Sequence, residues 1–165
     1  MKVVFIVVAL LPLALLAWGL MFRNSDGGFV TLQDFPALVR ALQTKSAKDS
    51  FWMVLIPGTA KTDGDNANLQ YSFEDGVVGM DWVLLAERNL DDKDKFLDFV
   101  HRAGATTEEK EGNGVRYLRA TGAKDLAGVG QEFLREIYGV KPEDNLQLAL
   151  SGFEWRRAPK TARTI

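Results

Sequence analysis

Residues 69–82 of the chain read LQYSFEDGVVGMDW. The central pair, Asp75-Gly76, is favoured in two-residue type I′ turns, and apolar and polar side chains alternate on both sides of it. A turn at this pair places the large apolar side chains on one face: Phe73 opposite Val78, Tyr71 opposite Met80 and Leu69 opposite Trp82. The other face carries Gln70, Ser72, Glu74 and Asp81. The stretch therefore predicts an antiparallel hairpin with one face against a core.

The chain after this hairpin alternates strands and helices in a regular order. Its apolar periodicity, glycines and prolines predict a strand over 77–86, a helix over 91–103, strands over 105–110 and 115–121, a helix over 124–138 and a strand over 145–155. The order βαββαβ is that of the ferredoxin-like fold, so we expect an α+β domain of this type. Gly130 lies on the apolar stripe of the second helix, which predicts close packing against the sheet.

Two further elements are predicted before the hairpin. Apolar residues recur at helical spacing from Leu32 to Leu42, and Thr31 with Asp34 three residues later is typical of a helix N-cap. The continuous apolar run over 51–56, FWMVLI, stops at Pro57-Gly58 and predicts a strand buried on both faces. We expect this extra N-terminal helix and these strands to extend the sheet or cover its edge.

The amino-terminal stretch over residues 3–22, VVFIVVALLPLALLAWGLMF, contains no charged residue. Twenty helical residues match a hydrocarbon core of about 30 Å, so the sequence predicts an N-terminal transmembrane helix in the bilayer. The alternative is a cleaved signal peptide, because residues 17–19 (AWG) offer small residues near a cleavage site. The flanking charges favour a single-pass protein with its domain on the non-cytoplasmic side.

The charge distribution divides the 165 residues into unequal parts. We expect a transmembrane anchor over 1–23, a linker over 24–30, a globular domain over 31–155 and a basic disordered tail over 156–165. Residues 29–155 carry 21 acidic and 14 basic side chains, whereas the tail carries four basic side chains and no acidic one. An acidic body repels phosphate backbones, so no nucleic-acid partner is expected for the domain.

The chain contains few of the residue types that commonly catalyse reactions or bind metal ions. Cysteine is absent and His101 is the only histidine, which excludes disulfide frameworks, thiol catalysis and cysteine-based metal centres. We assign no catalytic, cofactor-binding or metal-ligating residue, and we infer no cofactor and no small-molecule ligand. The densest acidic patch comprises Glu87, Asp91, Asp92, Asp94 and Asp98, which would lie near a helix N-terminus among interleaved lysines.

Two groups of residues are candidate contacts for a protein partner. Asp91 and Asp94 could dock a basic partner from the acidic patch. Trp155 ends the last predicted strand beside Arg156 and Arg157, and tryptophan and arginine are enriched where proteins meet.

The sequence thus favours a membrane-anchored, non-enzymatic binding or accessory domain that acts through protein–protein contacts. One alternative is a carboxylate-dependent hydrolase or transferase that uses Glu87 and the Asp91–Asp98 patch. Another is a cytoplasm-facing regulator of a nucleic-acid enzyme, in which the basic tail contacts lipid or RNA.

Overall fold

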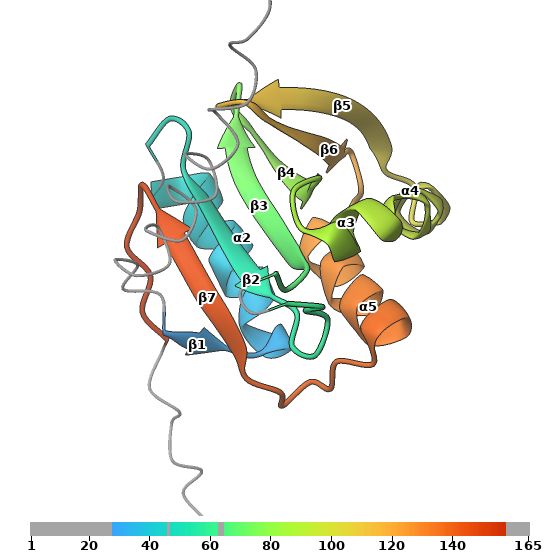
Figure 1. Ribbon diagram of the computed structural model, residues 1–165. Helices are drawn as coiled ribbons and strands as arrows, with labels where there is room; N and C mark the ends of the chain where they lie inside the picture. Colours follow the sequence, from blue (N-terminus) through green and yellow to red (C-terminus); the bar gives the residue numbers. More distant parts are fainter. Residues whose placement is uncertain (1–27, 46, 63–64, 158–165) are drawn as a thin grey trace, which may run out of the picture.

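The computed structural model describes residues 28–45, 47–62 and 65–157 of the chain (Figure 1). The described elements are β1 (Phe29–Val30), the 3₁₀ helix η1 (Leu32–Asp34), α2 (Phe35–Lys45), β2 (Phe51–Leu55), β3 (Asn68–Glu74), β4 (Val77–Val83), α3 (Glu87–Asp91), α4 (Lys93–Arg102), β5 (Thr106–Gly112), β6 (Val115–Thr121), α5 (Leu126–Tyr138) and β7 (Leu146–Ser151). The predicted α+β class is confirmed.

The strands form one curled sheet in the order β1-β7-β2-β3-β4-β6-β5, and every neighbouring pair is antiparallel (Figure 1). The ferredoxin-like fold is not confirmed. In that fold the last strand pairs with the first strand of the βαββαβ unit, whereas β2 and β3 lie between β7 and β4. The physical reason is the apolar strand β2, whose central residues are all buried and whose two edges are both hydrogen-bonded, to β3 and to β7.

The hairpin expected at Asp75-Gly76 is confirmed. Both turn residues have positive φ angles, 52° and 82°, as a type I′ turn requires. The register places Phe73 opposite Val78 and Tyr71 opposite Met80, as predicted. The turn between β5 and β6 is built in the same way, with Asn113 and Gly114 at positive φ angles.

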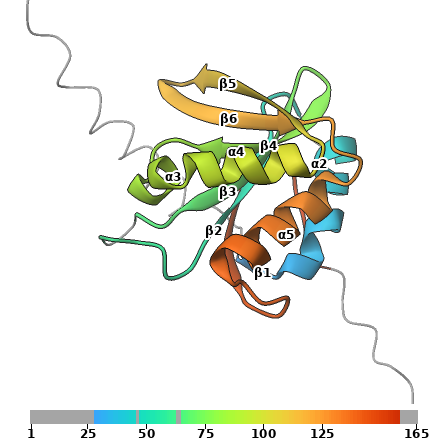
Figure 2. The ribbon, with the colours of Figure 1, turned by 90° about the vertical axis from the view of Figure 1, so that its right-hand side faces the viewer.

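Helices α2, α4 and α5 cover one face of the sheet (Figures 1 and 2). The core under α2 contains Trp52 stacked on Tyr71, with ring centroids 4.3 Å apart. The close packing predicted at Gly130 is confirmed, because a Cβ atom there would lie 1.8 Å from the Tyr71 hydroxyl oxygen. That hydroxyl donates a 3.0 Å hydrogen bond to the Leu126 carbonyl and so ties β3 to the first turn of α5.

The last strand is shorter than the sequence predicts. It ends at Ser151, and Gly152 follows with a φ angle of 82°, a conformation that favours glycine. The Ser50 hydroxyl oxygen lies 2.6 Å from the Ala47 carbonyl oxygen and 3.1 Å from the Gly152 carbonyl oxygen, so the bend packs closely against Ser50. Residues 153–157 therefore leave the sheet and turn towards η1, which brings Trp155 to a different part of the molecule than a continued strand would.

The helix predicted over 91–103 also differs. It begins earlier and consists of two helices, α3 and α4, which meet at Asp92. The predicted transmembrane segment over 3–22 and most of the basic tail lie outside the described residues. None of the helices within the described ranges is both long and apolar enough to cross a bilayer.

Candidate functional site

A groove of about 510 Å³ lies where the start of α2 meets the carboxyl-terminal segment. One wall carries Thr31, Gln33, Asp34 and Ala37, and the loop between α5 and β7 contributes Pro142, Glu143 and Asn145. The remaining wall is the segment Trp155–Arg157. Three of the residues expected at a partner contact therefore lie together, beside residues that the sequence had suggested only as a helix cap.

The wall formed by η1 is held together by hydrogen bonds between Thr31 and Asp34. The Asp34 carboxylate accepts a 2.8 Å hydrogen bond from the Thr31 amide and a 3.1 Å bond from the Thr31 hydroxyl, and the two residues form a capping box. The N-cap predicted from these residues is confirmed. Ala37, on the first turn of α2, is exposed and faces the groove.

The carboxyl-terminal wall is fastened to η1 by an ion pair. The Arg157 guanidinium donates two hydrogen bonds to Asp34, one of them from Nε at 3.1 Å. Burial raises the pKa of Asp34, but the bonds from Arg157 and Thr31 outweigh it and hold this pKa below its usual value. The ionised carboxylate thus joins residues from the two ends of the domain.

The groove presents an aromatic surface and two charges of opposite sign. Trp155 is partly buried and packs against the hydrophobic core, which fixes its ring at the groove. Arg156 and Glu143 are exposed, and within the described part of the chain neither forms an ion pair. The arrangement can accept an apolar side chain, a carboxylate and a cation at separate points.

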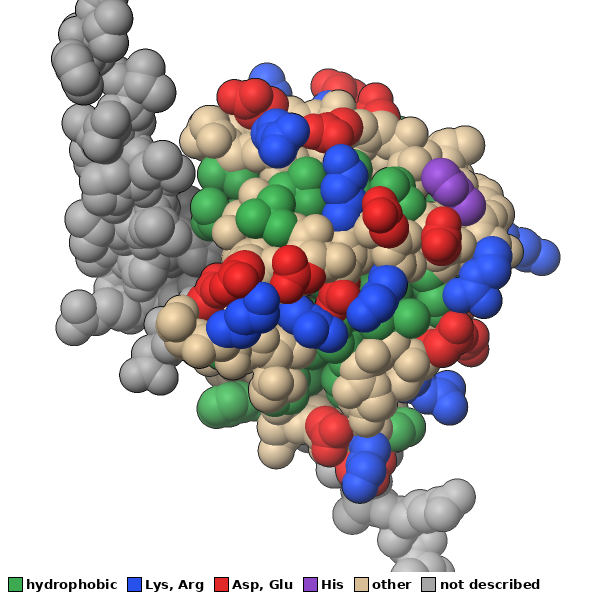
Figure 3. Space-filling model, turned by 45° about the vertical axis from the view of Figure 1, so that its right-hand side comes forward, with side chains coloured by type: hydrophobic (Ala, Val, Ile, Leu, Met, Phe, Trp, Pro, Cys, Tyr) green, Lys and Arg blue, Asp and Glu red, His purple; other side chains and the backbone are tan. Residues whose placement is uncertain are grey.

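Asp91 and Asp94, the other residues expected at a partner contact, lie elsewhere, on α3 and α4. Figure 3 shows basic and acidic side chains interleaved on this face of the molecule. Lys61 binds both Glu87, at 2.7 Å, and Asp91, at 2.9 Å, while Asp94 is exposed. Glu87 and Asp91 therefore share one lysine, whereas Asp94 forms no ion pair within the described residues.

Asp92, in the same patch, is buried and bound by several charged and polar side chains. Its side chain is 3% exposed and binds Arg88 at 2.6 Å and Lys95 at 2.7 Å. The Tyr138 hydroxyl donates a 2.8 Å hydrogen bond to the same carboxylate. Burial raises the pKa of Asp92, but these partners outweigh it and the pKa lies below its usual value. Asp92 thus fixes the junction of α3 and α4 to the end of α5.

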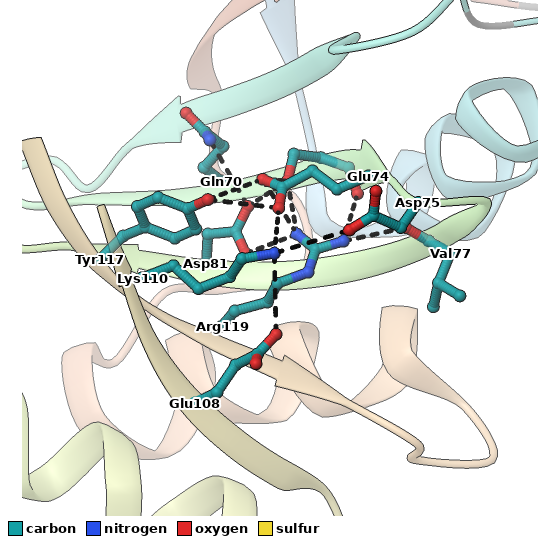
Figure 4. Close-up of polar contacts among 10 residues, drawn as sticks. Gln70, Glu74, Asp75, Val77, Asp81, Glu108, Lys110, Tyr117 and Arg119 are labelled. Atoms are coloured by element: carbon teal, nitrogen blue, oxygen red, sulfur yellow. Dashed lines mark hydrogen bonds and ion pairs between the residues drawn. The ribbon is translucent and has the colours of Figure 1, made fainter. Parts of the chain in front are cut away.

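A second cluster of polar side chains lies on the sheet face away from the helices (Figure 4). Asp81 on β4 and Arg119 on β6 are directly opposite each other, and Arg119 Nη1 lies 2.9 Å from Asp81 Oδ1. Both side chains are buried, at 0% and 3% exposure. The Ser72 hydroxyl donates to Asp81 and accepts a 2.6 Å bond from Arg119.

The cluster continues outward from Arg119 to β5. Glu74 accepts hydrogen bonds from Lys110, at 2.9 Å, and from the Tyr117 hydroxyl, at 3.0 Å (Figure 4). Burial raises the pKa of Glu74, but Lys110 and Arg119 outweigh it and hold the pKa below its usual value. These contacts join β3 to β5 and β6 and stabilise the curl of the sheet.

The pKa of Asp81 is typical of a proton-transfer group, but its side chain is not accessible to a substrate. Burial raises its pKa to about 6, although Arg119 and Ser72 both lower it. A pKa near neutrality in a cleft indicates a functional acid or base. Because the Asp81 side chain is fully buried, a substrate cannot reach it in this conformation. We therefore interpret the cluster as a structural one.

Sequence reasoning missed several residues of the groove and of the polar cluster around Asp81 and Arg119. The cap signal identified Asp34, but nothing in the local pattern pairs it with Arg157, 123 positions later. The hairpin register placed Asp81 on the polar face, and Gly79 on the same strand was the signal that a large side chain crosses there. His101, in the last turn of α4, is exposed and lies 2.8 Å from the Thr107 hydroxyl.

Within the described ranges, no group of three or more histidine or carboxylate side chains is arranged to hold a metal ion. In comparisons with protein-family models, curated proteins and solved structures, the chain finds no match.

Proposed function

We propose that the chain is a membrane-anchored, non-enzymatic binding domain, which uses the groove at Trp155–Arg157 to hold an extended segment of another protein. The observation that carries the proposal is the groove itself. It combines a fixed aromatic ring with an exposed Arg156 and an exposed Glu143, and its walls are held by the Asp34–Arg157 ion pair. Aromatic and arginine side chains dominate the binding energy of many protein interfaces.

The chemistry of the groove defines the partner segment. An acidic side chain is expected opposite Arg156, since guanidinium binds carboxylates in a bidentate manner. A basic side chain is expected opposite Glu143, and an apolar side chain against Trp155 and Ala37. The carboxylate-dependent reaction has weaker support, because Glu87 and Asp91 are exposed and share Lys61 as their partner.

Affinity purification of the full chain from detergent-solubilised native membranes tests the proposal. Trp155→Ala should reduce recovery of the bound protein about tenfold or more, because truncating an aromatic anchor costs about 2 kcal/mol of binding energy. Asp98→Ala, an exposed substitution on α4, is the matched control and should leave recovery unchanged. A partner that Trp155→Ala still recovers in full, or that the control loses equally, would overturn the proposed function.

A further inference from the structure

Only a short stretch of chain separates the amino-terminal apolar segment from the groove. This proximity supports a further inference about the partner, which rests on the proposed function. If residues 3–22 lie in the bilayer, Phe22 is the last residue in the hydrocarbon core and Gly28 follows six residues later. Six residues span at most about 21 Å when fully extended. The Gly28 carbonyl accepts a 3.0 Å hydrogen bond from the Leu148 amide, so the chain is fixed to the sheet at this point.

The groove begins directly after this attachment. Phe29 pairs with Gln147 in the short strand β1, and Thr31, two residues later, already lines the groove. Phe22 and Thr31 are therefore separated by at most about 32 Å. A compact domain of about 125 residues has a radius of gyration near 14 Å and hence a diameter of roughly 36 Å. The groove thus lies within one domain diameter of the end of the apolar segment, beside the point at which the chain joins the sheet.

The charges at the groove distinguish a peptide from a lipid surface. Asp34 and Glu143 balance Arg156 and Arg157, and the Arg157 guanidinium is already bound to Asp34. Recognition of anionic lipid headgroups uses clusters of about four to eight basic residues without such compensation. The polar groups of Gln33 and Asn145 add hydrogen-bonding sites of the kind that an extended backbone needs.

We infer that the groove binds a juxtamembrane segment of a second membrane protein, a segment with an acidic side chain for Arg156 and a basic one for Glu143. Both proteins would be confined to one membrane, which raises the effective concentration of the segment at the groove. A groove with few anchor residues can then be occupied without a high intrinsic affinity.

Residue-specific photocrosslinking of the full chain in native membranes tests this inference. A photoreactive side chain replaces Gln33, which is exposed at the groove, and a second variant carries it at Pro142, which is also exposed and lines the groove. Mass spectrometry then locates the attached peptide. The expected result is an adduct within about ten residues of a transmembrane segment in the partner, reduced about fivefold or more by Arg156→Glu.

The alternative outcomes separate the two proposals. An adduct with a soluble protein, or with a part of a membrane protein far from its membrane segments, overturns the juxtamembrane inference and leaves the proposed function standing. An adduct with phospholipid overturns both, because the groove would then face headgroups. The absence of any adduct from both positions also overturns both.

Discussion

The Asp34 carboxylate accepts two hydrogen bonds from Arg157, a residue that lies 123 positions later in the sequence. Asp34 sits in the 3₁₀ turn that leads into α2, and Arg157 is the last described residue of the chain. This contact, together with the packing of Phe153 and Trp155 against the core, holds the segment after Gly152 as a wall of the groove. The shape of the candidate site therefore depends on both.

Asp34→Asn should release the carboxyl-terminal wall. The ion pair is partly exposed, so its loss is expected to cost about 0.5–1 kcal/mol and to raise the opened fraction of the segment roughly two- to fivefold. Limited trypsin digestion measures this opening as the rate of cleavage after Arg156. Asp94→Asn, which removes a charge from an exposed position on α4, is the control. Trypsin should cleave this variant at the same rate as the parent. Equal rates in both variants would show that Arg157 does not fasten the segment.

Gly79→Ala should destabilise the domain. A Cβ atom at this position would lie 2.4 Å from the Arg119 guanidinium carbon, so the buried ion pair would have to shift. Overpacking of this kind costs about 1–3 kcal/mol, measured as the free energy of unfolding from tryptophan fluorescence in denaturant. The matched control is Gly112→Ala on β5, where the nearest atom would be 3.6 Å away. A control that is destabilised equally would contradict the role given to Arg119.

Gly130→Ala should also reduce the free energy of unfolding, by about 2 kcal/mol, even though alanine favours a helix by about 1 kcal/mol. The added methyl group would collide with the Tyr71 hydroxyl. Tyr71→Phe removes that hydroxyl and alone costs about 1 kcal/mol for the lost bond to Leu126. The double variant should be more stable than the sum of the single losses predicts. Strict additivity would argue that the two residues do not meet.

The titration of Asp81 predicts how stability depends on pH. Because its folded pKa of about 6 exceeds the reference value of 3.8, the folded state holds a proton that the unfolded state has released between these values. The contribution of Asp81 to the free energy of unfolding is therefore fully present below about pH 4 and is lost as the pH rises through 6.

Asp81→Asn removes this titration and places a neutral amide beside the buried Arg119 guanidinium at every pH. The stability difference between parent and variant should be largest near pH 4 and shrink towards pH 7. Carboxylates with lowered pKa values, such as Asp92, cause the opposite trend in both proteins and largely cancel. A difference that grows with pH over this range would refute the raised pKa of Asp81.

Local sequence signals predicted the elements of the fold well. Asp75-Gly76 specified a turn and a register, because few residues adopt positive φ angles and alternation then fixes which side chains face the core. Gly139 ends α5 with a φ angle of 67°, directly after the helix that the sequence predicts over 124–138. Gly130 predicted a close approach of helix and sheet, because a glycine inside a helix lowers its stability and is typical of places where another group packs against the backbone.

Long-range pairing could not be predicted in the same way. The apolar run of β2 indicated burial but not which strands would flank it, and its insertion beside β7 changed the strand order. The partnership of Asp34 with Arg157 joins two polar residues whose local patterns are independent of each other. The groove arises from this partnership and from the bend at Gly152. The sequence therefore indicates some of its residues individually, but it does not predict that they line one groove.

The most direct test of the groove is hydrogen exchange on the complex recovered from native membranes, compared with the same chain freed of its partner. Amide protection should increase over residues 31–37 and 142–157, while β5 and α4 should exchange at equal rates in both samples. Protection confined to the β5 edge or to α4, with the groove unchanged, would contradict the claim that this groove is where the domain binds another protein.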